Sequence, residues 1–267
     1  MDLESQKMDK TIIDSYNKNG FHIEKALLDK GYVANVADNL KRNFDNQLKF
    51  FNIVPPEDIY ESLKRLHQVD LDVYKKTAGT LWRKMSVFGL THHERIQQFV
   101  KDNFGWNDIT LPGGQVVHVQ ANSLRIPNGY FGVAAHQDFP SIQGSLDGIV
   151  IWIPLVDVDI NRYPLEVIPG SHNNGILPSI ENNDSSWEVS PECYNETDFI
   201  PIECEVGDVV FMSYFTVHRS SQNGDHRLRL ACSTRYDNPD EKTFIERTYP
   251  SAYIRTVNRE QLFSLIT

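Results

Sequence analysis

The chain has 267 residues and carries 36 acidic against 26 basic side chains, which gives a formal net charge of −10. This balance disfavours a nucleic-acid or anionic-membrane partner, because both present negative charge to the protein. Hydrophobic residues make up 40% of the chain, which is enough for a sizeable core, and no apolar run approaches the roughly 18 residues of a membrane-spanning helix.

The first residues lack a basic segment followed by an apolar one, so we expect no secretory leader. Three cysteines, Cys193, Cys204 and Cys232, are scattered without the CxxC spacing of a metal or redox motif. An odd number of isolated thiols is typical of a reducing compartment. We therefore expect a cytoplasmic protein, and the sequence says nothing about its oligomeric state.

Residues 1–110 are predicted to form a mostly helical layer. Apolar residues recur there at three- and four-residue spacing, which is the period of a helix with one buried face. The segments concerned are 8–16, 31–51, 59–66 and 95–104.

From Gln115 onward the chain changes to β-branched, alternating runs separated by Gly, Pro and Asn. Several short strands with this punctuation predict a core of two β-sheets. The predicted strands are 116–126, 148–155, 165–168, 208–214 and 228–236.

We expect a single domain over 1–267, because no linker rich in Gly, Ser or Pro divides the chain. Its parts are a helical layer at 1–110, a β core at 111–240 and a C-terminal segment at 241–267. A polar insertion at 173–205 interrupts the core. A loop of this length is usually functional or disordered, so a substrate lid and a solvated surface excursion both stay open.

His136-Gln137-Asp138, with His218 following 82 residues later, is the most informative motif. Alternate residues of an extended segment point the same way, so the histidine and the aspartate can act together. Two histidines and one carboxylate can occupy one face of an octahedral Fe(II) ion and leave three positions open. The H-x-D alone is a weak signal.

The sequence after His218 strengthens the assignment. Asn223-Gly224 is typical of a two-residue hairpin turn, in which both residues have positive φ. Such a turn would place Arg229 directly opposite His218 and Arg227 nearer the turn. A guanidinium binds a carboxylate through two hydrogen bonds, so Arg229 is a candidate anchor for a dicarboxylate on the metal. A surface hairpin is the alternative, and the apolar flanks at 209–212 and 228–232 argue against it.

With these motifs the chain resembles the phytanoyl-CoA dioxygenase family of Fe(II)/2-oxoglutarate-dependent oxygenases. The resemblance implies a mainly β fold with α-helices, in which a double-stranded β-helix (a cupin-like jelly-roll) is flanked by the N-terminal helices. One departure is Arg162-Tyr163, where relatives often carry a glycine. The matching segments are His136-Gln137-Asp138, Trp152-Ile153-Pro154-Leu155, residues 164–172 (PLEVIPGSH), Gly207-Asp208 and the H-x-S-x-x-N…R run from His218 to Arg229.

The resemblance also implies the cofactors and the main site residues. Fe(II) would be held by His136, Asp138 and His218, with 2-oxoglutarate and O2 as co-substrates. Arg229 would bind the distal carboxylate of 2-oxoglutarate. Related halogenases lack the carboxylate ligand, so the presence of Asp138 disfavours halogenation. His172 is expected to be a structural hydrogen-bonding group and not a ligand.

Further residues are candidates for the co-substrate site. Gln120 and Asn122 share a predicted strand face with His118, and an ordinary polar pair on a strand is the alternative. Trp152 is a candidate beside the co-substrate or a core tryptophan. Ser220 lies two residues after His218 and is a candidate helper of the carboxylate contact.

The substrate is expected to be a small, partly polar molecule such as a sugar, an amino-acid derivative or a secondary metabolite. Arg125, Tyr130 and Phe139 are candidate substrate contacts, with Phe131 and Gln143 nearby. The sequence shows no basic cluster for a CoA diphosphate, so the family's name is not carried over as a substrate.

The expected reaction is hydroxylation of an unactivated C–H bond with release of succinate and CO2. Two alternatives stay open. A zinc-dependent hydrolase also uses His and Asp ligands, but it gives Arg229 no role. A non-catalytic metabolite-binding protein with a β core would keep the ligands by descent.

Overall fold

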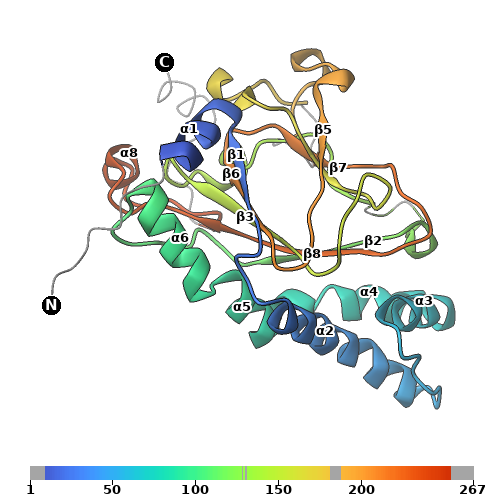
Figure 1. The fold of residues 1–267 in the computed structure, drawn as a ribbon. Helices are drawn as coiled ribbons and strands as arrows, with labels where there is room; N and C mark the ends of the chain where they lie inside the picture. Colours follow the sequence, from blue (N-terminus) through green and yellow to red (C-terminus); the bar gives the residue numbers. More distant parts are fainter. Residues whose placement is uncertain (1–9, 128, 130, 181–187, 254–267) are drawn as a thin grey trace, which may run out of the picture.

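Two antiparallel β-sheets form the centre of the computed structural model, which describes residues 10–127, 129, 131–180 and 188–253 (Figure 1). The strands are β1 (Phe21–Glu24), β2 (Val116–Gln120), β3 (Ile149–Pro154), β4 (Leu165–Val167), β5 (Ile200–Ile202), β6 (Val209–Ser213), β7 (His218–Ser220) and β8 (Arg229–Tyr236). The large sheet has the order β1-β6-β3-β8-β2, and the small sheet has the order β5-β4-β7.

The two sheets pack face to face. Val150 and Trp152 of β3 and Met212 of β6 belong to the same buried cluster as Leu165 and Val167 of β4. Because successive side chains of a strand point to opposite faces, the other face of β3 is left for a different partner. This arrangement confirms the predicted jelly-roll core.

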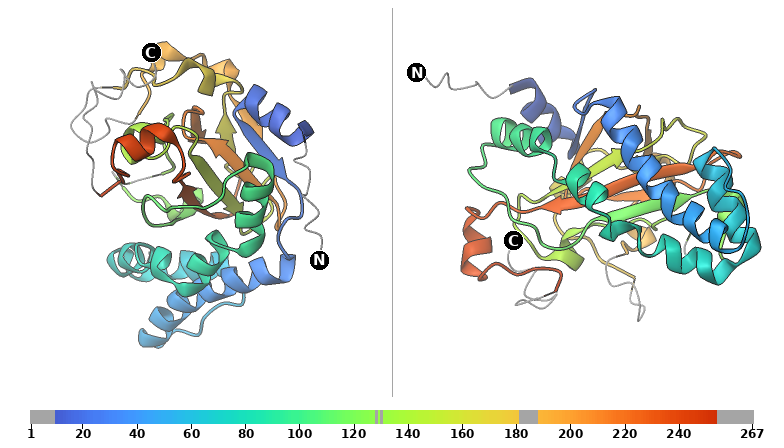
Figure 2. Two further views of the ribbon diagram at one scale, coloured as in Figure 1. Left: turned by 90° about the vertical axis from the view of Figure 1, so that its left-hand side faces the viewer. Right: turned by 90° about the horizontal axis from the view of Figure 1, so that it is seen from below.

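The N-terminal helices cover the outer face of the large sheet (Figure 2). These helices are α1 (Lys10–Asn19), α2 (Lys30–Phe50), α3 (Ile59–Val69), α4 (Leu71–Ala78), α5 (Met85–Thr91) and α6 (Glu94–Phe104). Two short helices, α7 (Phe139–Ile142) and α8 (Lys242–Glu246), occur later in the chain. The longest, α2, buries a stripe of apolar residues at three- and four-residue spacing, as the sequence predicted. The stripe comprises Val33, Val36, Leu40, Phe44 and Leu48.

A side-chain cap explains where α2 begins, and its apolar stripe packs in one cluster with strand β3. The Asp29 carboxylate accepts a hydrogen bond of 2.7 Å from the N–H of Tyr32, which satisfies a donor that the first turn leaves unpaired. Ile149 and Ile151 of β3 are fully buried in the same cluster as the α2 stripe. Since helices cover one face of β3 and the small sheet covers the other, all six of its residues are buried, which explains its continuous apolar sequence.

The structure differs from the predicted elements in several places. The strand predicted at 116–126 ends at Gln120, and a 3-10 turn, η2 (Asn122–Leu124), follows it. Helices α4 and α5 lie within the predicted helical layer but were not among its named segments, and strand β1 was not predicted. The four residues of β1 show intermediate burial throughout, and they form a strand by pairing with β6. Such a short segment carries no periodic signal of its own.

The polar insertion at 173–205 is partly built into the small sheet. It contains β5, which pairs with β4, and Glu188 forms a β-bridge with His136. A solvated excursion therefore does not describe these parts of it. Residues 181–187, which include Trp187, lie outside the described residues.

The hairpin predicted across Asn223 and Gly224 is wrong. Strand β7 pairs with β4 in the small sheet, whereas β8 pairs with β2 and β3 in the large one. Neither Asn223 nor Gly224 has a positive φ. Gly224 instead forms a bridge with Arg162, and the ring of Tyr163 occupies the space that a side chain at Gly224 would need. The connection thus crosses from one sheet to the other.

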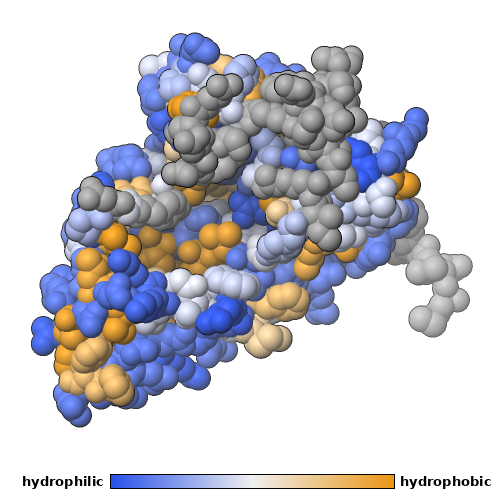
Figure 3. All heavy atoms as spheres, turned by 180° about the vertical axis from the view of Figure 1, so that it is seen from behind, coloured by the Kyte–Doolittle hydropathy of each residue, from blue (hydrophilic) through white to orange (hydrophobic). Residues whose placement is uncertain are grey.

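The surface carries some apolar side chains. Figure 3 shows hydrophobic patches within a mostly hydrophilic face, and Phe50, Val54 and Met85 are among the exposed large residues. Apolar atoms make up more than half of a typical folded surface, so these exposures by themselves mark no binding site. None of the helices in the described ranges is long and apolar enough to cross a bilayer.

Candidate active site

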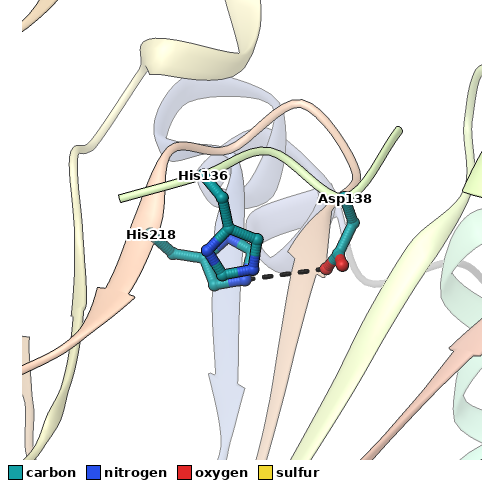
Figure 4. Close-up of side chains that lie close together, drawn as sticks. All are labelled: His136, Asp138 and His218. Atoms are coloured by element: carbon teal, nitrogen blue, oxygen red, sulfur yellow. Dashed lines mark ion pairs between the residues drawn. The ribbon is translucent and has the colours of Figure 1, made fainter. Parts of the chain in front are cut away.

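The structure brings the three predicted metal ligands together between the two sheets (Figure 4). His136, Asp138 and His218 are buried, and their potential ligand atoms all lie within 4.8 Å of one another. The backbones of His136 and His218 exchange two hydrogen bonds of 3.0 Å, so the two imidazoles start from paired positions. Asp138 has helical backbone angles at the start of α7, so the carboxylate reaches the site through a turn and not along a straight strand.

Backbone carbonyls orient both imidazole rings. Nδ1 of His136 lies 2.8 Å from the oxygen of Ala134, and Nδ1 of His218 lies 2.9 Å from the oxygen of Thr216. A carbonyl can only accept, so these contacts assign the proton to Nδ1 and the lone pair to Nε2 in each ring. Burial lowers the pKa of His136 to about 3, with His218 adding to the effect, and burial also lowers the pKa of His218. Both rings are therefore neutral at pH 7.

The Asp138 carboxylate is ionised and only partly satisfied. Burial alone would raise its pKa, but the positive charge of Arg235 and the hydrogen bond from its guanidinium help to lower this pKa to about 2. Oδ1 accepts a hydrogen bond of 2.9 Å from Nη2 of Arg235. Oδ2 is buried without a hydrogen-bond partner in the described part of the chain. It lies 3.6 Å from Nε2 of His218, which is too far for a hydrogen bond.

This set of donors fits a divalent transition metal. Two neutral imidazole nitrogens and one carboxylate oxygen form the ligand set of non-haem Fe(II) sites, and zinc accepts the same atoms. An unpaired, buried carboxylate oxygen is costly, and a cation bound at Asp138 Oδ2 would remove that cost.

A pocket extends between the sheets from the metal ligands to Arg229. Arg229 is only 1% exposed. Its Nη1 donates to the carbonyl of Tyr163 and its Nη2 to Oγ of Ser220, both at 3.1 Å. The structure therefore places Arg229 in the same pocket as His218, as the sequence predicted, but it does so by stacking two sheets and not through a hairpin.

The other residues predicted for the co-substrate site divide into two groups. Trp152 and Ser220 line the pocket. Gln120 lies opposite Arg229 in the β2–β8 register, and its buried Oε1 has no partner among the described groups. Asn122 is exposed in η2, and its Oδ1 accepts a hydrogen bond from Arg125. We therefore drop Asn122 from the co-substrate contacts.

The structure places the predicted substrate contacts in three different environments. Phe139 is fully buried in the cluster between the sheets and stacks on Phe215 with ring centroids 4.6 Å apart, so it is a core residue. Gln143 is also buried. Arg125 is exposed and stacks on the ring of Phe131 at 3.5 Å. Tyr130 lies outside the described residues.

Two residues were expected to lie outside the metal site. Arg227 forms ion pairs with Asp159 and Asp225 at 2.6 and 2.8 Å, and its side chain is 35% exposed. His172 has Nε2 2.9 Å from the carbonyl of Asn17. Neither residue is among those that line the pocket of the metal ligands.

Sequence reasoning missed Arg235 and Ser233 and gave His118 no role, yet all three line the pocket. The available signal was the alternation of β8, because residues 229, 231, 233 and 235 share one face. Once Arg229 is assigned to the pocket, Arg235 follows. Its contact with Asp138, 97 residues away in sequence, was not readable from spacing.

Comparison with known proteins places the chain among oxygenases and their homologues. The model of the phytanoyl-CoA dioxygenase (PhyH) family matches residues 16–231. A phytanoyl-CoA dioxygenase domain-containing protein 1 homolog from Dictyostelium discoideum is 29% identical over 122 residues, which is 43% of each chain. A phytanoyl-CoA dioxygenase from Arabidopsis thaliana is 28% identical over 45% of this chain and 38% of the relative. The chain thus aligns with less than half the length of these relatives.

Solved structures show the same fold. The epimerase SnoN, in complex with Fe3+, alpha ketoglutarate and nogalamycin RO, has a TM-score of 0.58 at 20% identity, covering 86% of this chain and 83% of SnoN. EctD from S. alaskensis, with 2-oxoglutarate and 5-hydroxyectoine, has a TM-score of 0.56 at 13% identity, covering 91% and 80%.

Proposed function

The chain belongs to the phytanoyl-CoA dioxygenase family, and from this premise we propose that it is an Fe(II)- and 2-oxoglutarate-dependent dioxygenase that hydroxylates an unactivated C–H bond of a small, partly polar metabolite. One observation carries the proposal. His136 and His218 of the buried His136–Asp138–His218 cluster line one pocket together with the buried cation Arg229. A metal and a dicarboxylate can occupy such a pocket together.

His136, Asp138 and His218 would hold the metal. Bound Fe(II) supplies the redox chemistry that activates O2 as 2-oxoglutarate is converted to succinate and CO2. The chain keeps both imidazoles neutral and correctly oriented through the carbonyls of Ala134 and Thr216. It also keeps Asp138 ionised, because Arg235 offsets the effect of burial.

Arg229 would bind the distal carboxylate of 2-oxoglutarate. Its guanidinium is held by the Tyr163 carbonyl and Ser220 Oγ, so it is oriented before any ligand arrives. The apolar side chains of Trp152, Leu165 and Met212 line the pocket. They exclude water and strengthen a charge-assisted contact there.

A small-molecule substrate is supported by the relatives. The SnoN structure contains nogalamycin RO and the EctD structure contains 5-hydroxyectoine. The fully buried position of Phe139 removes one of the predicted substrate contacts. Arg125 and Phe131 remain the described candidates.

Anaerobic titration of 2-oxoglutarate into the Fe(II) protein tests the proposal. We expect a visible charge-transfer band in the wild type, and O2-dependent release of succinate with a matching substrate. Arg229→Ala should lose the band at the same 2-oxoglutarate concentration, whereas Arg227→Ala should keep it. A zinc-dependent hydrolase would show no such band. A binding protein without catalysis would show the band but release no succinate.

A further inference from the structure

A continuous set of hydrogen bonds links the metal-ligand carboxylate to His118 on β2, the edge strand of the large sheet. Arg235 donates from Nη2 to Oδ1 of Asp138 at 2.9 Å and from Nη1 to Oγ of Ser233 at 3.2 Å. Oγ of Ser233 lies 2.9 Å from Nε2 of His118. Arg235 and Ser233 share one face of β8, and His118 is on the adjacent strand β2.

The donors and acceptors of this network agree in direction. Ser233 Oγ accepts from Arg235, so the serine hydrogen is available to His118. Burial, together with the positive charges of Arg229 and Arg235, lowers the pKa of His118 well below its usual range. His118 is therefore neutral, and its Nε2 can accept the serine hydrogen. Every member of the network then has a consistent role.

We propose that Arg235 is a positioning residue that fixes the Asp138 carboxylate so that Oδ2 is presented to the metal, with Ser233 and His118 holding the guanidinium in place. The inference rests on the metal site proposed above.

The argument for positioning is geometric. A carboxylate has two equivalent oxygens and rotates about a soft terminal torsion. Arg235 occupies Oδ1 of Asp138, so Oδ2 is the oxygen left without a hydrogen-bond partner among the described groups, and it is the one that faces His218. Arg235 projects from the strand between β3 and β2, and its side chain is 15% exposed. A rigid strand and a second hydrogen bond to Ser233 limit its movement.

A different role for Arg235 is contact with a carboxylate of 2-oxoglutarate, because its buried Nε has no partner in the described part of the chain. The two roles predict different losses. A positioning residue is needed for metal binding before any co-substrate is present. A co-substrate contact is needed only once the metal is bound.

The test measures Co(II) affinity of the full chain by anaerobic calorimetry without 2-oxoglutarate. Arg235→Met should weaken Co(II) binding by about 10- to 100-fold, the usual effect of losing a residue that orients a metal ligand. Arg235→Lys should recover part of the affinity, because it keeps the charge but loses the fork. Ser233→Ala should weaken binding less than Arg235→Met. Arg227→Met, which removes an ion-paired surface arginine, is the matched control and should bind Co(II) like the wild type.

Two further readouts separate positioning from a general structural role. At saturating Co(II), the visible spectrum of Arg235→Met should change shape, because the carboxylate is no longer held in one orientation. The 2-oxoglutarate affinity, measured at the same Co(II) saturation, should fall less than in Arg229→Ala. If Arg235→Met does not fold, Arg235→Lys and Ser233→Ala carry the same comparison.

Unchanged Co(II) affinity in the Arg235 variants would overturn the inference while leaving the proposed function intact. A loss confined to 2-oxoglutarate affinity would instead make Arg235 a co-substrate contact. An equal loss in Arg227→Met would show that the effect is not specific to the network. A wild-type protein that binds neither Co(II) nor Fe(II) would overturn both the inference and the proposed function.

Discussion

The two faces of the large sheet share one backbone, but one face packs against the helices and the other lines the pocket. The face toward the helices carries apolar side chains such as Ile149, Ile151 and Phe211. The face toward the small sheet carries Arg229 and Arg235 and lines the pocket. Because alternate residues of one strand serve the two faces, a substitution and its neighbour in sequence should have different consequences. Stability and chemistry are thus interleaved along each strand.

The largest loss of activity is expected when one of the three proposed metal ligands is replaced. Replacing His136, Asp138 or His218 by Ala should abolish turnover, because each loss opens the facial ligand set. Asp138→Gly should keep some metal binding through the two histidines and lose hydroxylation. Metal content and succinate release measure both. His172→Ala is the control, and loss of metal in that variant with retention in His218→Ala would reverse the ligand assignment.

The next largest effect is a loss of 2-oxoglutarate affinity on replacement of Arg229, compared with replacement of Arg227 two residues earlier. Removing one side of a buried charge-assisted pair costs roughly 2–5 kcal/mol, so Arg229→Ala should weaken 2-oxoglutarate binding by tens to thousands of fold at about 1.4 kcal/mol per decade. Arg229→Lys should recover part of it. Arg227→Ala should change little, since its guanidinium pairs with Asp159 and Asp225. Anaerobic titration gives the affinities, and a larger loss at Arg227 would contradict the placement of both arginines.

The helix-facing side should respond in stability and not in binding. Ile151 is fully buried against the helical layer, and Ile→Ala at such a site costs about 2–5 kcal/mol. Ile151→Ala should therefore lower the free energy of unfolding in urea by that amount. Its metal and 2-oxoglutarate affinities, measured at low temperature where it is folded, should match the wild type. Parallel losses of stability and metal affinity would show that the two faces are not independent.

A smaller effect is expected where the chain leaves β8. Burial raises the pKa of Asp237 to about 7, so the folded state holds a proton that the unfolded state has released above about pH 4. That contribution to stability is fully present below about pH 4 and is lost progressively as the pH rises to about 7. Between pH 5 and 7 the wild type should lose about 2 kcal/mol more than Asp237→Asn. Urea unfolding at both pH values measures this, and equal slopes would refute the raised pKa.

Long elements with a regular apolar pattern could be predicted from the sequence, whereas short ones could not. The α2 stripe and the strands β3, β6 and β8 follow from periodicity and apolar runs, because those signals are local and long. The four residues of β1 carry no such signal, and pairing with β6 makes them a strand. The same holds for Glu188, which joins the small sheet through a bridge to His136.

The sequence by itself determined the ligand set and the family, because an H-x-D, a distal histidine and the motifs around them are written in residue types and order. Tertiary structure alone decided how Arg229 reaches the site. The hairpin prediction placed Arg229 beside His218 for the wrong reason, since two stacked sheets, and not one pair of strands, bring these two residues into one pocket. The contact of Arg235 with Asp138 could not be predicted from the sequence either, because the fold brings together two residues that are 97 positions apart.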